Sequence, residues 1–283
     1  MTPLGHARYC DELQQQTAQL TALVRDAAPG LPVPTCPGWT VAGLLRHIGG
    51  NLLAVGTAVR TGMPVDDPEA QVDGLAGPEG DEESGEGAGE EGADAGTPAL
   101  CAWVRGAAEA AAEILRAAGP VAEAQVWGMR QTTGAWARRA AHDVVVHRAD
   151  AAAAVGAEYT VAPEVAADAV EEFLDLMGGP GMAPRLAEPY GGPGAGRLRW
   201  RATDTGSGTD TGGAADWTVE LCDAGFRWHR TGGRPGTPDV EVSGDLADVL
   251  RVLYRRLPPG DERVTVTGDA ALLGHWLDRV SLG

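Results

Sequence analysis

The chain has 283 residues, of which 43% are hydrophobic and 22% charged, so its composition is that of a globular protein and not of a disordered chain. Its formal net charge of −18 argues against nucleic acid as the main partner, because binding to phosphates requires a basic surface. A strongly acidic stretch contributes much of this charge, since 12 of the 40 acidic residues lie between Asp66 and Asp94.

Cysteine usage and the N-terminal sequence bear on the compartment. Four cysteines without a C-x-x-C spacing are too few for a disulfide scaffold in a chain of this length, so we expect reduced thiols. The N-terminus lacks the basic and then apolar pattern of a signal peptide, and no stretch approaches the roughly 20 apolar residues that a membrane span needs. These features predict a cytoplasmic protein without a membrane partner.

Apolar residues at helical spacing predict four helices in the first half of the chain. The expected helices cover about residues 6–28, a segment that begins after Thr40 and runs past Leu52, and residues 97–118 and 134–153. Thr40 and Thr97 are the expected N-caps of the second and third helices. Four helices that each bury one stripe predict an antiparallel bundle.

The segment from about residue 64 to residue 96 interrupts this helical pattern. It consists of Gly, Glu, Asp, Ala and Pro with almost no large apolar side chain. Such a composition cannot bury enough surface to offset the entropy of ordering, so we expect a disordered acidic insertion between two helices.

Beyond Ala162 the sequence predicts a small α+β domain. A helix over residues 163–177 precedes runs with strand character, and two further helices are expected over 245–256 and 269–280, with Asp245 and Asp269 as caps. The expected strands cover residues 197–202, 217–222, 226–229, 240–242 and 264–267. We therefore expect a helical domain over residues 1–160 and an α+β domain over residues 161–283, with glycine-rich breaks at 178–196 and 203–215.

Three side chains of the helical domain are candidate ligands of a divalent metal ion. Asp143 and His147 are four residues apart, which places them on one face of the fourth helix. His47 follows Leu44 by three residues and is predicted to point from the second helix into the bundle. An Asp and a His at this spacing also occur often as an exposed pair, so the spacing alone leaves both interpretations open.

Other polar residues lie beside these candidates. His142 lies about 100° around the helix from Asp143 and is not expected to be a ligand; a hydrogen bond behind the site or a place on the helix surface is more typical. Asp150 has two interpretations, as an acceptor behind a ligand or as the partner of an arginine. Arg138, Arg139 and Arg148 are expected on a solvated face or in ion pairs between the domains.

Two segments of the bundle resemble the signatures of one enzyme family. The segment 34–49 contains Pro37-Gly38-Trp39-Thr40 and then Leu44-Leu45-Arg46-His47, and it resembles the opening of the mycothiol-dependent maleylpyruvate isomerases, which are DinB-like metalloenzymes. The segment 142–150, with Asp143 and His147, is similar to the second signature of that family. Segments 240–245, 254–258 and 266–270 are similar to its C-terminal domain. The resemblance implies a DinB-like four-helix bundle followed by a small α+β domain, a fold of class α plus α+β.

The resemblance also implies a metal site and a thiol cosubstrate. A divalent ion, usually zinc, would be bound by His47, Asp143 and His147 with a fourth position open. The isomerases most like the family prototype have Glu where this chain has Asp143, which is one methylene shorter. The cosubstrate would be mycothiol, held as a metal-bound thiolate that attacks a small electrophilic substrate in an isomerase or S-transferase reaction. Mycothiol is a thiol of GC-rich actinobacteria, and the absence of lysine with only two isoleucines is typical of a GC-rich genome.

One residue of the C-terminal domain is a candidate catalytic residue. Arg256 precedes Leu257-Pro258, and we expect it to reach an anionic substrate or the cofactor from that domain. The sequence leaves the oligomeric state open, although a monomer would suffice.

Two other functions are compatible with the same residues. A metal-dependent hydrolase of this fold would use bound water in place of a thiol, and its activity would not require mycothiol. A non-catalytic binding or regulatory protein would need neither metal nor thiol.

Overall fold

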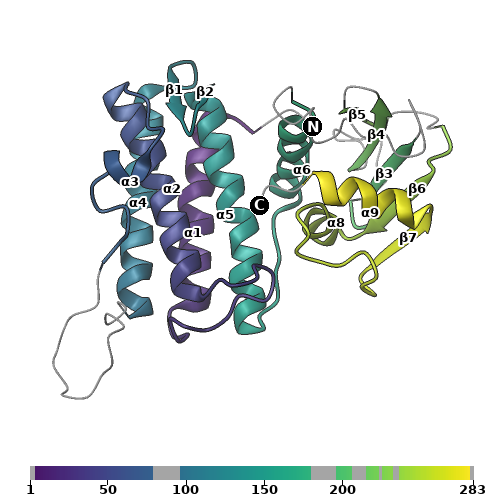
Figure 1. Cartoon of the computed structure of the whole chain (residues 1–283), viewed down its shortest axis with the longest axis horizontal. Coiled ribbons are helices and arrows are strands. Elements are labelled where there is room, and N and C mark those ends of the chain that lie inside the picture. The colour runs from purple at the N-terminus through teal and green to yellow at the C-terminus, as the bar shows by residue number, and fades with distance from the viewer. Residues whose placement is uncertain are drawn as a thin grey trace. The chain divides into compact units, whose positions relative to one another are not determined.

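A computed structural model describes residues 4–78, 96–179, 196–205, 215–222, 225–231 and 236–280 (Figure 1). The chain divides into two compact units, Leu4–Tyr159 and Thr160–Gly283, which we call the N-terminal and C-terminal units. The N-terminal unit is mostly helical and the C-terminal unit contains a sheet, in the order that the sequence predicts, which confirms the fold class. Within the described ranges, no helix is both long enough and apolar enough to cross a membrane.

Four long helices form the bundle of the N-terminal unit. α1 packs against α4 and α5, and α2 packs against the same two helices, so the four helices enclose one core (Figure 1). Leu44, Leu45 and Ile48 of α2 are fully buried there. The bounds of the elements are α1 His6–Val24, α2 Val41–Thr61, α3 Pro68–Gln71, α4 Thr97–Ala118, β1 Glu123–Val126, β2 Met129–Thr132 and α5 Thr133–Val155.

The ends of these helices follow local chemistry. Thr40 caps α2 as expected, since its side-chain oxygen accepts a hydrogen bond from the amide of Gly43 at 3.2 Å. α1 ends at Val24, four residues before the expected end, and Pro29 lies a short way beyond it. The expectation for Thr97 was wrong: Gly96 is the N-cap of α4, and the Thr97 hydroxyl donates instead to the carbonyl of Ala27 at 2.7 Å.

A short hairpin that the sequence analysis did not predict precedes α5. β1 and β2 pair antiparallel, and Trp127 and Gly128 at the turn have φ angles of 50° and 74°. Two successive positive φ values are typical of the tight turns that suit the twist of a hairpin. The indole nitrogen of Trp136 donates to the carbonyl of Ala124 at 3.0 Å, which fixes the hairpin to the start of α5.

The expected disordered insertion at 64–96 was wrong over its first part. Val65 pairs with Val126 in a parallel bridge and is buried, and residues 68–71 form the short helix α3. Val72 is also buried, and Leu75 packs against the core. A few apolar residues therefore anchor a segment whose average composition is that of a linker. Residues 79–95 of the expected insertion lie outside the described ranges.

In its described residues, the C-terminal unit contains a mixed sheet and three helices. The strand order is β5-β4-β3-β6-β7, in which β3 and β6 run parallel and the other neighbours are antiparallel. Trp200 of β3 lies against Trp276 of α9, and Trp276 also contacts Phe173 of α6, so aromatic rings form the core. The elements are α6 Pro163–Met177, β3 Arg197–Ala202, β4 Asp216–Cys222, β5 Gly225–Arg230, β6 Val240–Gly244, α8 Leu246–Leu253, β7 Val264–Gly268 and α9 Ala270–Arg279.

The two expected aspartate caps of this unit have different outcomes. Asp269 accepts hydrogen bonds from the amides of Ala271 and Leu272 at 3.0 Å, so it caps α9 as predicted. Asp245 makes no capping hydrogen bond, because Asp204 accepts from the amide of Leu246 at 3.0 Å and takes that place at the start of α8. The loop after β3 thus supplies a cap that sequence proximity could not indicate.

Candidate metal centre

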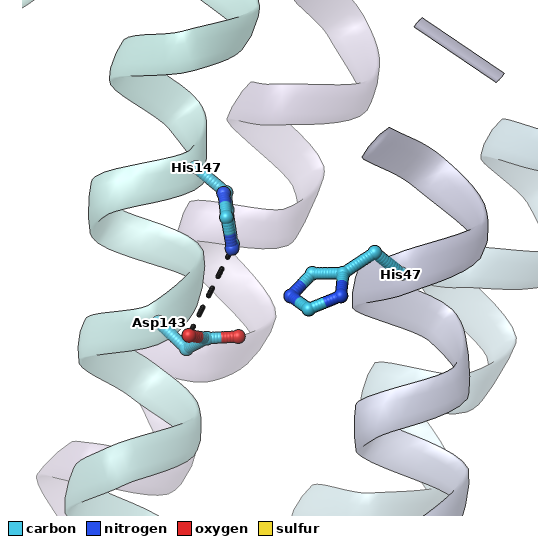
Figure 2. Close-up of side chains that lie close together, drawn as sticks. All are labelled: His47, Asp143 and His147. Carbon is cyan, nitrogen blue, oxygen red and sulfur yellow. Dashed lines mark ion pairs between the residues drawn. The ribbon is translucent and has the colours of Figure 1, made fainter. Parts of the chain in front are cut away.

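Two helices of the bundle bring the three predicted ligands together. His47 lies on α2, and Asp143 and His147 lie one turn apart on α5. Each of the three offers one ligand atom, and these atoms all lie within 4.8 Å of one another. Figure 2 shows the two imidazoles and the carboxylate facing a common space between the helices. His147 is buried, whereas the side chain of Asp143 is 26% exposed.

A buried carboxylate fixes the orientation of His147. The Nδ1 atom of His147 lies 2.8 Å from Oδ2 of Asp150, which has no exposed surface. The other oxygen of Asp150 accepts a hydrogen bond from the hydroxyl of Thr35 at 2.6 Å. Because the carboxylate accepts the Nδ1 proton, the lone pair of His147 is on Nε2, 3.9 Å from Oδ1 of Asp143. Asp150 thus lies behind His147, the position that the first of its two interpretations requires.

Both oxygens of Asp143 receive hydrogen bonds. Arg139, one turn earlier on α5, donates from Nη2 to Oδ1 at 3.1 Å. Asn51 of α2 donates from Nδ2 to Oδ2 at 3.4 Å and lies 3.1 Å from Nε2 of His47. Burial by itself raises the pKa of Asp143, but the electrostatic interactions with His147, Arg139 and His47 and the Asn51 hydrogen bond together leave it below its ordinary value. Asp143 is therefore held as a carboxylate, the form that a metal ion requires.

An indole ring forms a wall of the site. The ring of Trp39 meets the ring of His47 edge-on with the centroids 4.8 Å apart, and it stacks on the ring of His147 at 6.1 Å. Trp39 precedes the Thr40 cap of α2, so the turn that begins this helix also positions the indole. An apolar wall against two imidazoles lowers the local dielectric and restricts the access of water.

The other residues that the sequence singled out lie elsewhere. His142 is fully buried and meets the ring of Tyr9 at 5.8 Å, which places it in the core and not on the helix surface. Arg148, expected on a solvated face or between domains, is also buried, and its Nε donates to Gln16 of α1 at 2.8 Å. Arg256 belongs to the C-terminal unit and donates from Nη1 to the carbonyl of Tyr254 at 2.8 Å.

Four residues of the site were missed by sequence reasoning as participants. Asn51 lies one turn after His47, so the same helical spacing that joined Asp143 to His147 could have indicated it. Arg139 had the same signal, four residues before Asp143. Thr35 had no such signal, because its partner Asp150 lies 115 positions away in the chain. Trp39 contacts both His47 and the distant His147, but it lies before the helix, where helical spacing does not apply.

The donor set fits a divalent transition metal ion. Two imidazoles and one carboxylate are the ligands of many catalytic zinc sites, in which a fourth position takes water or substrate. Asp143 and His147 also have partners that orient them, as outer hydrogen bonds do in natural metal sites. The residues present are therefore sufficient to hold such an ion.

Comparison with known proteins gives two matching family models and several similar structures. The model described as the mycothiol maleylpyruvate isomerase N-terminal domain matches residues 10–152, and the model of the C-terminal domain of the same family matches residues 164–275. Crystal structures of the mycothiol-dependent maleylpyruvate isomerase and of a histidine-to-alanine mutant have TM-scores of 0.58. They are 18% and 17% identical to this chain, and each match covers 95% of this chain and 98% of the other, which shows a shared fold. No curated protein matches the sequence. Since the N-terminal model alone spans half of the chain, the protein belongs to the mycothiol maleylpyruvate isomerase family and is an enzyme of that kind.

Proposed function

We propose that this enzyme uses a divalent ion, zinc in the first instance, to activate the thiol of mycothiol for attack on a small electrophilic substrate. The observation that carries the proposal is the convergence of His47, Asp143 and His147, whose ligand atoms lie within 4.8 Å of one another. When bound, an ion with one open coordination position takes up a thiol and lowers its pKa, so that the thiol is a nucleophile at neutral pH.

The chain's own residues would prepare this chemistry in defined ways. Asp150 holds the Nδ1 proton of His147, which leaves Nε2 as the ligand atom. Arg139 and Asn51 hold the carboxylate of Asp143. The indole of Trp39 contacts both imidazoles, edge-on at His47 and stacked at His147, and would restrict their movement. The side chains therefore fix protonation states and geometry before any substrate arrives.

Arg256 is the proposed catalytic residue of the C-terminal unit. A guanidinium forms two parallel hydrogen bonds to a carboxylate, so Arg256 would bind an anionic group of the substrate or of mycothiol. Replacement by Gln should raise KM for that anion or lower kcat/KM while leaving the bound metal unchanged. Wild-type kinetics in this variant would mean that Arg256 binds neither the substrate nor mycothiol.

Isomerisation is the reaction that we propose first. The solved relatives are described as maleylpyruvate isomerases, so maleylpyruvate is the first substrate to assay. In an isomerisation the thiol adds to the substrate and leaves again, so catalytic amounts of mycothiol suffice. Stoichiometric consumption of mycothiol would indicate conjugation, the second candidate.

We also propose a cytoplasmic location, which is supported by the absence of a disulfide among the four cysteines, all of them in the described ranges.

The deciding experiment combines metal analysis with a thiol-dependence assay. We expect one zinc ion per chain in the wild type, and loss of both the ion and the activity in Asp143→Ala and His147→Ala. His275→Ala, on α9 of the C-terminal unit, is the matched control and should retain the ion. Full metal content and turnover in His147→Ala would refute the proposal. Metal-dependent turnover at the same rate with and without mycothiol would refute it as well.

A further inference from the structure

The carboxylate of Asp143 is engaged before any metal ion arrives. Oδ1 accepts from Arg139 at 3.1 Å, and Oδ2 accepts from Asn51 at 3.4 Å. A bound ion needs a lone pair of one of these oxygens, so it must displace a donor or share an oxygen with it. The two donors are not equivalent, because the amide of Asn51 is neutral whereas the guanidinium carries a full positive charge.

Arg139 is bound to the oxygen that faces the other ligand of α5. Oδ1 of Asp143 is the atom that lies 3.9 Å from Nε2 of His147, so the guanidinium binds the carboxylate oxygen nearest this imidazole, while the other oxygen extends toward His47 (Figure 2). The side chains of Arg139 and Asp143 are 20% and 26% exposed. An ion pair that is this far withdrawn from water is screened less than a surface pair.

The charge of the ligand set also depends on Arg139. Two neutral imidazoles and one carboxylate carry a net charge of −1, which attracts a dication. With the guanidinium on the carboxylate, the four side chains together are neutral, and the guanidinium repels the incoming ion. Because the guanidinium stays protonated throughout the physiological pH range, pH cannot relieve this repulsion.

We propose that Arg139 sets the metal affinity of the site by competing with the ion for the carboxylate of Asp143. Arg139 is thus a positioning residue that holds Asp143 in place and at the same time weakens the binding of the ion. This inference rests on the proposed metal centre. It adds that the site is built for exchangeable binding and not for the tightest binding that its three ligands permit.

The test is the affinity of the metal-free protein for Zn²⁺, measured by competition with a chelator of known affinity. Arg139→Gln keeps an aliphatic stem and a neutral donor to Asp143 but removes the charge, so we expect binding about tenfold tighter than in the wild type. Arg139→Lys keeps the charge and should bind with nearly wild-type affinity. Arg138→Gln, on the preceding residue of α5, removes the same charge from another face of the helix and is the matched control.

A second readout distinguishes competition from a structural effect. The visible absorption of bound Co²⁺ reports the ligand set, and it should be the same in the wild type and in Arg139→Gln if the same three residues bind the ion. Weaker or unchanged Zn²⁺ binding in Arg139→Gln would overturn the proposal, and so would equal tightening in Arg138→Gln. Failure of the wild type itself to bind Zn²⁺ or Co²⁺ would instead overturn the metal centre and this inference with it.

Discussion

Asp150 is the residue on which the orientation of His147 depends. It has no exposed surface, and its two oxygens bind His147 Nδ1 and the hydroxyl of Thr35. Asp150→Asn retains the shape but removes the negative charge that holds the Nδ1 proton. We expect the affinity for Zn²⁺ to fall by about 10- to 100-fold, as is typical when such a partner is lost. Chelator competition measures this loss.

The control for Asp150 is Thr35→Val, which removes the hydrogen bond of Asp150 that does not involve His147. It should weaken Zn²⁺ binding less than Asp150→Asn does, because the carboxylate still contacts His147. Equal losses in the two variants would mean that both act by disturbing the fold, and not through the proton on Nδ1.

The ionisation of Asp143 gives the metal-free protein a dependence on pH. The folded state lowers the pKa of Asp143, so the stabilisation from this group is fully present above the ordinary carboxyl range and is lost as the pH falls through the folded pKa. In Asp143→Asn this contribution disappears. We expect the difference in unfolding midpoint between wild type and variant to shrink as the pH falls from 7 toward 3, in thermal unfolding of the metal-free proteins.

At the scale of residues, sequence patterns indicated the candidate ligands better than the side chains that contact them. Helical spacing placed Asp143 and His147 on one face, and the apolar stripe of α2 placed His47 inward. The pattern could not show that Thr35 would reach Asp150, because that contact depends on how the loop before α2 meets α5. It also placed Arg148 on a solvated face or in an ion pair between the domains, since a charged side chain is buried in a bundle only when distant partners such as Gln16 are present.

At the scale of elements, close packing of α2 on α4 is a testable feature. Gly49 lies two residues after His47, and a Cβ at this position would overlap the ring of Trp103. Gly49→Ala should therefore lower the free energy of unfolding by about 2 kcal/mol, because the helices must separate to admit the methyl group. Urea unfolding monitored by circular dichroism measures the change.

A second glycine in the same pair of helices is the matched control for Gly49. Gly106 of α4 has nothing within 4 Å of the position that a Cβ would occupy, and it is exposed. Gly106→Ala should raise the free energy of unfolding by about 0.5–1 kcal/mol, since alanine loses less backbone entropy in a helix. Destabilisation by both substitutions would contradict the assignment of the Gly49 effect to Trp103.

Elements with strong local signals were predicted, and those that depend on neighbours were not. Thr40 and Asp269 cap their helices as their sequences indicate. The hairpin of β1 and β2 is too short and too polar for a strand pattern, and its pairing with Val65 comes from a segment that composition assigned to a linker. A few buried apolar residues decide such cases, and an average over thirty residues hides them.

At the scale of the whole molecule, all residues of the candidate metal centre belong to one unit. His47, Asp143 and His147 lie within Leu4–Tyr159, as do Thr35 and Asp150. A fragment of residues 1–160 should therefore bind Zn²⁺ with the affinity of the full chain, while Arg256 and any activity that needs it are lost. Chelator competition on the fragment checks this. Markedly weaker binding by a folded fragment would show that the C-terminal unit contributes to the site.

The strand order of the C-terminal unit is the part of the architecture that sequence could least provide. Alternating burial identifies β3 as a strand, with Leu198, Trp200 and Ala202 inward. β3 nevertheless pairs in parallel with β6, which follows it only after β4 and β5. Pairing across such a connection depends on side-chain packing over the whole sheet, which no local pattern contains.

The placement of the proposed ligands on α2 and α5 has a consequence for the lifetime of the protein. His47 and Asp143 are nearly one hundred residues apart in sequence, so an ion that joins them closes a long loop and can be bound tightly only by the folded chain. An ion present at 100 times its dissociation constant would stabilise the folded state by about 2.7 kcal/mol, and chelation should lower the melting temperature accordingly. Because cellular proteases degrade unfolded chains, metal starvation would then reduce the abundance of this enzyme as well as its activity.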